Sequence, residues 1–189
     1  MAAASTSGLV TPEQFLAMQE EAGAELVDGR IVEVPMGSMS SWLGGFLFAR
    51  IFGYVREHDL GWVFPQETGM TIWPGRYTVR KPDLVFVGKG RLPGRQPDEG
   101  WLTTVPDLVV EIVSPNDRAG DLERKLDKYR DAGIRLIWVI FPATRRAHVL
   151  GAGRSRSELG PDGSLDGEDV LPGFRCTLQE LFEAAQPEA

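Results

Sequence analysis

The chain has 189 residues, of which 42% are hydrophobic and 25% are charged, and its formal net charge is -7. This length and composition suit one domain over residues 1–189. One cysteine and two histidines exclude an internal disulfide and an ordinary Cys/His zinc cage, so any metal ion is expected to be bound mainly by oxygen.

The N-terminal residues 1–8 have no cationic start and no apolar stretch of signal-peptide length, which favours a cytoplasmic protein. The longest uninterrupted apolar run, Leu136 to Phe141, is far shorter than the roughly 20 residues that cross a bilayer. No membrane segment is therefore expected. The acidic total also argues against a protein that coats nucleic acid through bulk electrostatics.

The first half of the chain gives clear local signals. Thr11 is a good N-cap and Pro12 suits the first helical position, so a helix is predicted from Pro12 to about Ala22. Asp28-Gly29 between two β-prone runs predicts a hairpin over residues 25–34. Apolar residues at spacings of three and four predict a second helix over about residues 40–57.

Short β-prone segments and two further helices follow, which makes the chain α/β. The strands are expected at residues 62–65, 70–73, 83–87 and 108–113, separated by turns rich in Gly and Pro. A third helix is predicted at about residues 120–132. The apolar run 136–141 is typical of a central strand buried on both faces, and residues 147–150 are suited to pair beside it. Residues 151–169 are predicted to form a loose hairpin or loop, residues 178–184 a last short helix, and the final residues a frayed end.

Glu111 lies in the middle of a strand-like run of aliphatic residues. Because side chains alternate on a strand, Glu111 shares a face with Val109 and Val113, and Leu108, Val110 and Ile112 take the other face. An ionised carboxylate among valines is costly unless a cation, a metal ion or a proton offsets its desolvation.

Distance decides which aspartate shares a metal ion with Glu111. Asp107 is four residues away on the same strand, on the order of 13 Å at about 3.3 Å per residue, whereas Mg²⁺ holds oxygens at roughly 2.1 Å. Asp83 begins a different strand, and neighbouring strands are only about 4.8 Å apart. Asp83 and Glu111 are therefore the candidate metal ligands, and Asp107 is expected to be a turn or strand-end residue.

The helix after Glu111 supplies a candidate cation. Leu122, Leu126 and Tyr129 form its apolar stripe, and Lys125 lies about 60° from the centre of that stripe at 100° per residue, against about 120° for Lys128. Lys125 therefore points toward the core side. One interpretation is a lysine whose stem packs along Tyr129, and the other is a catalytic cation that orients water and balances charge on a phosphate.

A local basic segment stands out in this acidic chain. Residues 76–95 contain six cations and one anion, Asp83. Such a run is either a solvated hairpin and loop or a phosphate-facing edge. If it is the latter, the candidate nucleic-acid contacts are Arg80, Lys81, Lys89 and Arg91.

Three stretches of the sequence together have a familiar pattern: VPDLVVEIVSPNDRAGDLERKLDKYRDAGIRLIWVI, the upstream RKPDLVFV and the early AELVDGRIVEV. They resemble the Uma-two family of restriction-endonuclease-like proteins in the PD-(D/E)XK nuclease superfamily. The resemblance extends from about Thr11 to Phe182, and Glu-x-x-Ser-Pro, Lys-Leu-x-x-Tyr and Gly-Ile-x-x-x-Trp occur at the family's spacing.

The resemblance implies a restriction-endonuclease-like core over about residues 11–183, which is a mixed sheet flanked by helices. It also implies that Asp83 is the family's Asp and Glu111 its metal-binding Glu. The superfamily's usual Lys, two residues after the Glu, is replaced here by Val113, and the resemblance implies that Lys125 takes over its function. Glu25, in the family's Glu-Leu-x-x-Gly hairpin, is a further site residue. The family often has a His at the start of the second helix, where this chain has Ser40-Ser41.

These residues are compatible with two alternative functions. The first is an endonuclease that hydrolyses phosphodiester bonds in DNA with Mg²⁺ or Mn²⁺, with Asp83, Glu111, Lys125 and Glu25 as its catalytic residues. The alternative is a binding or regulatory module that keeps the nuclease fold without catalysis, which the acidic total and Val113 favour. A homodimer is a further expectation, because two-fold symmetry suits the cutting of both DNA strands.

Overall fold

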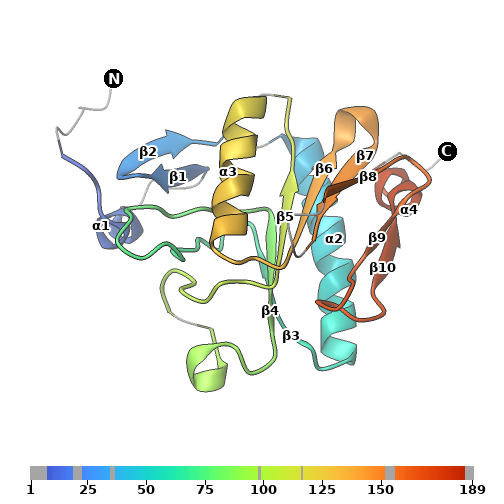
Figure 1. Cartoon of the computed structure of the whole chain (residues 1–189), viewed down its shortest axis with the longest axis horizontal. Helices are drawn as coiled ribbons and strands as arrows, with labels where there is room; N and C mark the ends of the chain where they lie inside the picture. The colour runs from blue at the N-terminus through green and yellow to red at the C-terminus, as the bar shows by residue number, and fades with distance from the viewer. Residues whose placement is uncertain are drawn as a thin grey trace.

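A six-stranded mixed sheet is the centre of the fold (Figure 1). The computed structural model describes residues 8–18, 23–34, 37–97, 99–115, 117–151 and 156–185. Across the sheet the order is β3, β4, β5, β6, β7, β8; β5 and β6 are parallel, and the other neighbours are antiparallel. The strands are β3 Gly61–Pro65, β4 Leu84–Gly88, β5 Leu108–Ile112, β6 Leu136–Phe141, β7 Arg146–Leu150 and β8 Arg156–Leu159.

One face of the sheet is covered by α3 (Ala119–Asp131). This helix is the crossover that a parallel pair of strands requires, and it connects β5 with β6. Leu126 and Tyr129 of α3 are fully buried against Val109 of β5 and Ile137 of β6. In Figure 1 the helix stands beside the sheet, on the same side as the N-terminal hairpin.

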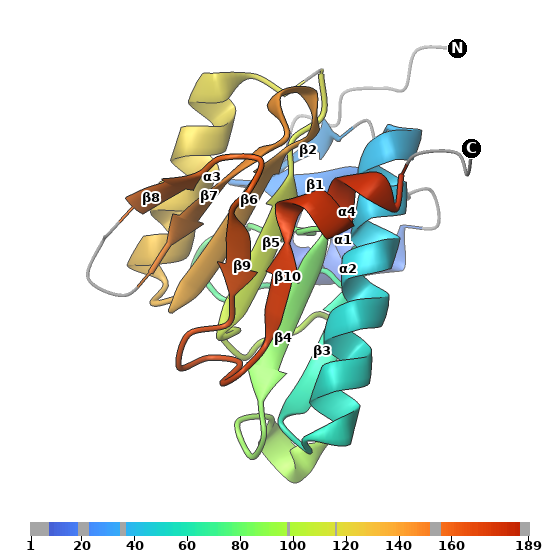
Figure 2. The same ribbon diagram turned by 90° about the vertical axis from the view of Figure 1, so that its right-hand side faces the viewer.

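The opposite face is covered by α2 (Ser38–Glu57), α4 (Leu178–Glu183) and the hairpin of β9 (Ser164–Asp166) and β10 (Arg175–Thr177), which lie in front of the sheet in Figure 2. Leu108, Val110 and Ile112 of β5 belong to the core on this side. The predicted alternation on β5 is therefore confirmed, and Glu111 faces the α3 side.

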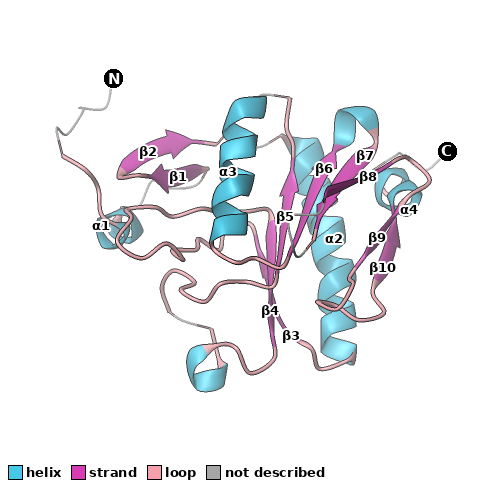
Figure 3. Ribbon diagram, viewed as in Figure 1, coloured by secondary structure: helices cyan, strands magenta, loops and turns pink. Residues whose placement is uncertain are grey.

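A second, smaller sheet lies beside α3. It is the hairpin of β1 (Ala24–Val27) and β2 (Arg30–Glu33), which follows α1 (Pro12–Ala17), as the strands and helices of Figure 3 show. The Asp28-Gly29 turn has φ angles of 49° and 80°, the left-handed values that this dipeptide tolerates and that two-residue hairpins need. Two short 3₁₀ turns, Pro93–Arg95 and Pro142–Thr144, complete the elements.

Three expectations about local structure need correction. Residues 70–73 form no strand: Met70 makes only isolated bridges to Arg80 and Leu102, because Pro74 and Gly75 end the extended run at once. The region predicted as a loose hairpin or loop contains β8 and β9, since backbone pairing with β7 forms a strand from polar, exposed residues that show no hydrophobic alternation. The first helix ends at Ala17; residues 19–22 and the frayed end at 186–189 lie outside the described residues.

Among the residues that the structure describes, no helix is both long enough and apolar enough to cross a membrane.

Candidate active site

Asp83 and Glu111 lie side by side on neighbouring antiparallel strands. Leu84 of β4 is paired with Val110 of β5, so the residue before Leu84 stands opposite the residue after Val110. Directly opposed residues of an antiparallel pair project from the same face. The register is fixed further because the Ile112 N–H donates to Asp83 Oδ2 at 2.6 Å. The structure therefore brings together the two carboxylates that the sequence selected.

Helix α3 holds both oxygens of Glu111. The Lys125 Nζ lies 2.8 Å from Oε2, and the Tyr129 hydroxyl donates to Oε1 at 2.6 Å. Lys125 and Tyr129 are four residues apart and therefore project from one side of the helix. The predicted inward position of Lys125 is confirmed, since its side chain is only 12% exposed. The hydrogen-bonding role of Tyr129 was missed, because its place in an apolar stripe indicated packing alone.

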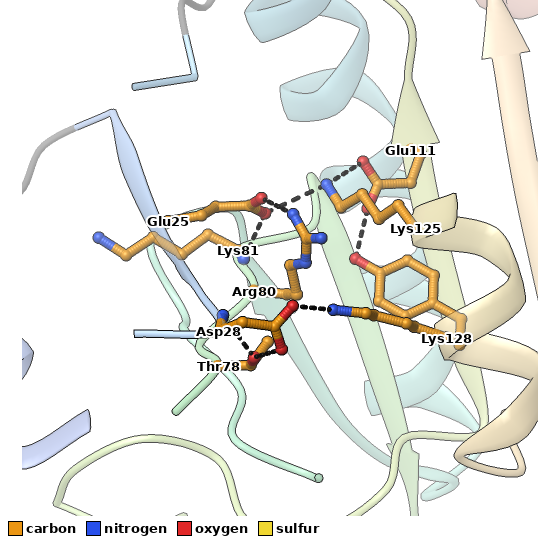
Figure 4. Close-up of polar contacts among 9 residues, drawn as sticks. Glu25, Asp28, Thr78, Arg80, Lys81, Glu111, Lys125 and Lys128 are labelled. Carbon is orange, nitrogen blue, oxygen red and sulfur yellow. Dashed lines mark hydrogen bonds and ion pairs between the residues drawn. The ribbon is translucent and has the colours of Figure 1, made fainter. Parts of the chain in front are cut away.

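Glu25 of β1 reaches the same cluster from the N-terminal hairpin (Figure 4). Its Oε1 lies 3.2 Å from Lys125 Nζ and accepts the Lys81 backbone N–H at 2.9 Å, and its Oε2 accepts from the Arg80 guanidinium at 2.6 Å. Lys125 is thus placed between two buried carboxylates, those of Glu25 and Glu111. The arrangement joins residues from β1, β5 and α3 in one network.

The hairpin is docked next to α3 by a second set of contacts. Leu26 bridges to Val79, and the Asp28 N–H donates to the Thr78 hydroxyl at 3.1 Å. Asp28 Oδ2 also lies 3.1 Å from Lys128 Nζ, one helical turn from Lys125 (Figure 4). The Asp-Gly turn therefore does more than reverse the chain: it fixes the position from which Glu25 reaches Lys125.

Burial and charge together set the protonation of the cluster. Burial alone would raise the pKa of Glu25, but Lys125 and Arg80 lower that pKa to about 2. Burial would lower the pKa of Lys125, but Glu111 and Glu25 raise it above its ordinary value. Burial raises the pKa of Glu111, although Lys125 opposes the shift. The two carboxylates therefore favour the charged form of Lys125, which suits it to act as a cation in the cluster.

Of the three carboxylates Glu25, Asp83 and Glu111, Asp83 is the one whose charge is least compensated by protein cations. Burial first, and repulsion by Glu111 second, raise its pKa to about 7, although the hydrogen bond from Ile112 acts in the other direction. A divalent cation next to Asp83 and Glu111 would remove this repulsion.

Without metal ions, we expect Asp83→Asn to raise the free energy of unfolding at about pH 8 by about 4 kcal/mol and to change it little at about pH 4. The pKa of Asp83 is about 7 in the folded state against 3.8 ordinarily, so its stabilising contribution is complete below the ordinary value and is lost as the pH rises through 7. Asn does not ionise and still accepts the Ile112 N–H. Urea unfolding at both pH values measures the difference, and equal effects at both would contradict the expectation.

Glu25, Asp83, Glu111 and Lys125 line a pocket of about 550 Å³. Other lining residues include Gln66 after β3, and Ser114, Asp117 and Arg118 between β5 and α3. Within the described ranges no three His, Cys, Asp or Glu side chains are grouped as a metal site. The pair of Asp83 and Glu111 nevertheless fits Mg²⁺, because this ion keeps several waters and uses one or two carboxylates in addition to substrate phosphates.

The predicted basic segment does not form one edge. Lys81 lines the pocket, and its Nζ lies 5.6 Å from the ring centroids of Phe15 and Trp101. Lys89 pairs with Asp59, and Arg91 pairs with the buried Asp107; neither cation lines the pocket. Arg80 and Lys81 precede β4, whereas Lys89 and Arg91 follow it, and the five residues of this strand span on the order of 16 Å. The two pairs of cations therefore lie far apart.

Asp107 has the structural role expected of it. Its carboxylate is only 2% exposed, accepts the Gly88 N–H at 2.8 Å and lies 3.3 Å from the Arg135 guanidinium, in addition to its pair with Arg91. It therefore joins the starts of β5 and β6 to the end of β4, away from Glu111.

Comparison with protein families identifies the chain. The family model described as "Uma2: Putative restriction endonuclease" matches residues 12–179. The chain belongs to the Uma2 family. The resemblance of the Glu111 to Trp138 stretch to that family is thereby confirmed. Among curated proteins, no significant match is found for this Uma2 chain.

A solved structure supports the fold of this Uma2 protein. It is a crystal structure from Anabaena variabilis, described as "a putative nuclease belonging to DUF820". The TM-score is 0.78 at 19% sequence identity, and the match covers 94% of this chain and 99% of the other. A match at this identity establishes the shared architecture, which is the mixed sheet flanked by helices that the family resemblance implied.

Proposed function

We propose that this Uma2 protein is a metal-dependent endonuclease that hydrolyses phosphodiester bonds in DNA. The observation that carries the proposal is the placement of Asp83 and Glu111 on one face of adjacent strands, with the buried ammonium of Lys125 on the Glu111 carboxylate. Membership of a family whose model is described as "Putative restriction endonuclease" supports the nuclease class.

Asp83 and Glu111 would hold Mg²⁺ or Mn²⁺ together. When bound, such an ion supplies a water of lowered pKa and polarises a phosphate oxygen. Lys125 contributes a fixed positive charge next to Glu111, which suits it to stabilise negative charge that develops on the phosphate. Glu25, whose pKa is about 2, is suited to hold Lys125 in place rather than to transfer protons.

Lys81 is the best-placed of the four predicted nucleic-acid contacts for holding the DNA backbone outside the reacting centre, because it lines the pocket. Arg80 also lines the pocket, but its side chain is nearly buried. Lys89 and Arg91 are at the far end of β4, outside the pocket, where they pair with Asp59 and Asp107.

A binding or regulatory module without catalysis is the second candidate. It is favoured by the fact that Lys125 and Tyr129 already satisfy both oxygens of Glu111 within the protein, and by Val113 at the superfamily's usual Lys position. In that case the network around Lys125 would be a structural one.

A cleavage assay on circular and linear DNA tests the proposal. We expect nicking or linearisation with Mg²⁺ or Mn²⁺, no cleavage with EDTA, and a loss of at least about 10²-fold in Asp83→Asn. The matched control is Asp107→Asn, which changes the aspartate of the other Pro-Asp-Leu-Val stretch, outside the pocket. Because Asp107 is a buried structural residue, this variant is compared per folded molecule, and on that basis it should cleave like the wild type. Cleavage that survives in Asp83→Asn, or a folded wild type that cuts no DNA with either ion, would exclude the proposed mechanism.

A further inference from the structure

Arg80 is a buried guanidinium that uses little of its hydrogen-bonding capacity. Its side chain is 11% exposed, and NH1 donates to Glu25 Oε2 at 2.6 Å. The Nε atom is fully buried and has no hydrogen-bond partner among the described residues. A guanidinium carries five N–H donors, and a buried donor without an acceptor costs about 1–3 kcal/mol. A site of this kind requires an explanation.

The location of Arg80 distinguishes it from the other buried side-chain donors that lack a partner within the described part of the chain. Those donors are the Nε of Arg130 and the indole N–H of Trp138, and neither residue lines the pocket, whereas Arg80 does. In Figure 4 the guanidinium of Arg80 lies between Glu25 on one side and the α3 residues on the other. Its remaining donors are therefore next to the cluster of Glu111 and Lys125 rather than in the core or in bulk solvent.

The chemistry of these donors limits what can satisfy them. A metal ion has no acceptor to offer to an N–H group, and a positive charge next to Arg80 would be repelled. The missing partner must bring oxygen acceptors next to two cations, Arg80 and Lys125. A water molecule can satisfy the Nε atom alone, whereas a ligand that uses the rest of the guanidinium must also suit the positive charge. An oxyanion meets both requirements, and the planar fork of Arg matches two phosphate oxygens better than the ammonium of Lys does.

We propose that Arg80 is the phosphate-binding residue of the pocket and that its free N–H groups hold non-bridging oxygens of the phosphodiester that reacts. Arg80 then belongs to the reacting centre and not to an outer basic edge. That the bound group is a phosphodiester of DNA rests on the proposed function. Glu25 orients the guanidinium through NH1 and holds Lys125 through its other oxygen, so one carboxylate positions both cations. The proposed binding of an oxyanion by Arg80 does not require that the chain cleaves DNA.

Inorganic phosphate is the probe for the subsite, and ³¹P NMR line broadening measures its binding with and without Mg²⁺. We expect saturable binding by the wild type, at least about tenfold weaker binding by Arg80→Lys, and none by Arg80→Gln. Arg80→Lys keeps the charge next to Glu25 and loses only the fork, so it separates geometry from charge. The control is Arg124→Gln, an exposed cation that lines the same pocket and pairs with Asp121; its binding should stay within about twofold of the wild type.

DNA cleavage supplies a second measurement. We expect Arg80→Lys to lower kcat by about 10²-fold or more and to change KM little, because the contact strengthens as charge develops on the phosphate. A lowered Tm with normal kcat per folded molecule would show a structural role only and would overturn the proposal.

The outcomes separate this inference from the proposed function. Phosphate binding that depends on Arg80 in a protein that cuts no DNA would refute the nuclease proposal and leave the subsite standing. Phosphate binding that is absent in the wild type, or equal in wild type, Arg80→Lys and folded Arg80→Gln, would refute the subsite. If Arg80→Gln fails to fold, the comparison of wild type with Arg80→Lys decides.

Discussion

Replacing Glu111 by Gln is expected to lower DNA cleavage by about 10³-fold or more, which corresponds to roughly 4 kcal/mol of lost transition-state stabilisation. The substitution keeps the volume of the side chain and an oxygen that accepts from Tyr129 or Lys125. What it removes is the negative charge opposite Asp83, and with it half of the proposed metal site.

The same variant is expected to lose stabilisation by metal ions. A ligand that binds only the folded state raises the free energy of unfolding according to its concentration and Kd. Mg²⁺ or Mn²⁺ should therefore raise the Tm of the wild type and have little effect on Glu111→Gln. Glu158→Gln is the control, because Glu158 of β8 is exposed and pairs with Arg146 of β7. Unchanged metal stabilisation in Glu111→Gln would move the metal site away from Glu111.

Replacing Lys125 by Met is expected to destabilise the protein by about 3 kcal/mol at neutral pH and to abolish cleavage. Met keeps most of the buried stem and removes the ammonium, so Glu25 and Glu111, at 3% and 7% exposure, lose the cation they share. Arg80 still pairs with Glu25, but no other ion pair with Glu111 is present among the described residues. Glu111 is therefore the carboxylate left uncompensated.

A double-mutant cycle in urea tests this explanation for Lys125. Lys125→Met combined with Glu111→Gln should be less destabilised than the sum of the two single variants, because the second change removes the unpaired charge. Lys128→Met is the matched control on the same helix: its partner Asp28 is 57% exposed, and the loss should be under about 1 kcal/mol. Additive effects in the cycle, or equal losses for Lys125→Met and Lys128→Met, would contradict the proposed network.

Elements with strong local patterns could be predicted from the chain alone. The helix α2 was expected over about residues 40–57 and spans Ser38–Glu57, and the apolar run 136–141 is β6. The Asp28-Gly29 turn was also predicted, because its conformational preference is a property of the dipeptide. The strand β8 could not be predicted, because its residues are polar and exposed and its structure comes from pairing with β7.

The same distinction applies to the candidate site: local patterns predicted some of its residues and not others. Alternation on a strand, the spacing of strands and the helical angle of Lys125 are local geometry, and they identified Asp83, Glu111 and Lys125 before any fold was known. Glu25 entered only through family resemblance, because it is separated from Arg80 by 55 positions and from Lys125 by 100. No local pattern predicts contacts at such separations.

The sequence by itself therefore determined the residue types of the site, their faces on strand and helix, and the family of the chain. The tertiary structure decided which charges meet: it joined Lys125 to two carboxylates, placed Asp83 directly opposite Glu111, and separated Lys89 and Arg91 from the pocket. It also showed that Arg80 is buried with unused donors. The physical reason is that alternation and helical period are set by neighbouring residues, whereas desolvation and charge pairing depend on segments that folding alone brings together.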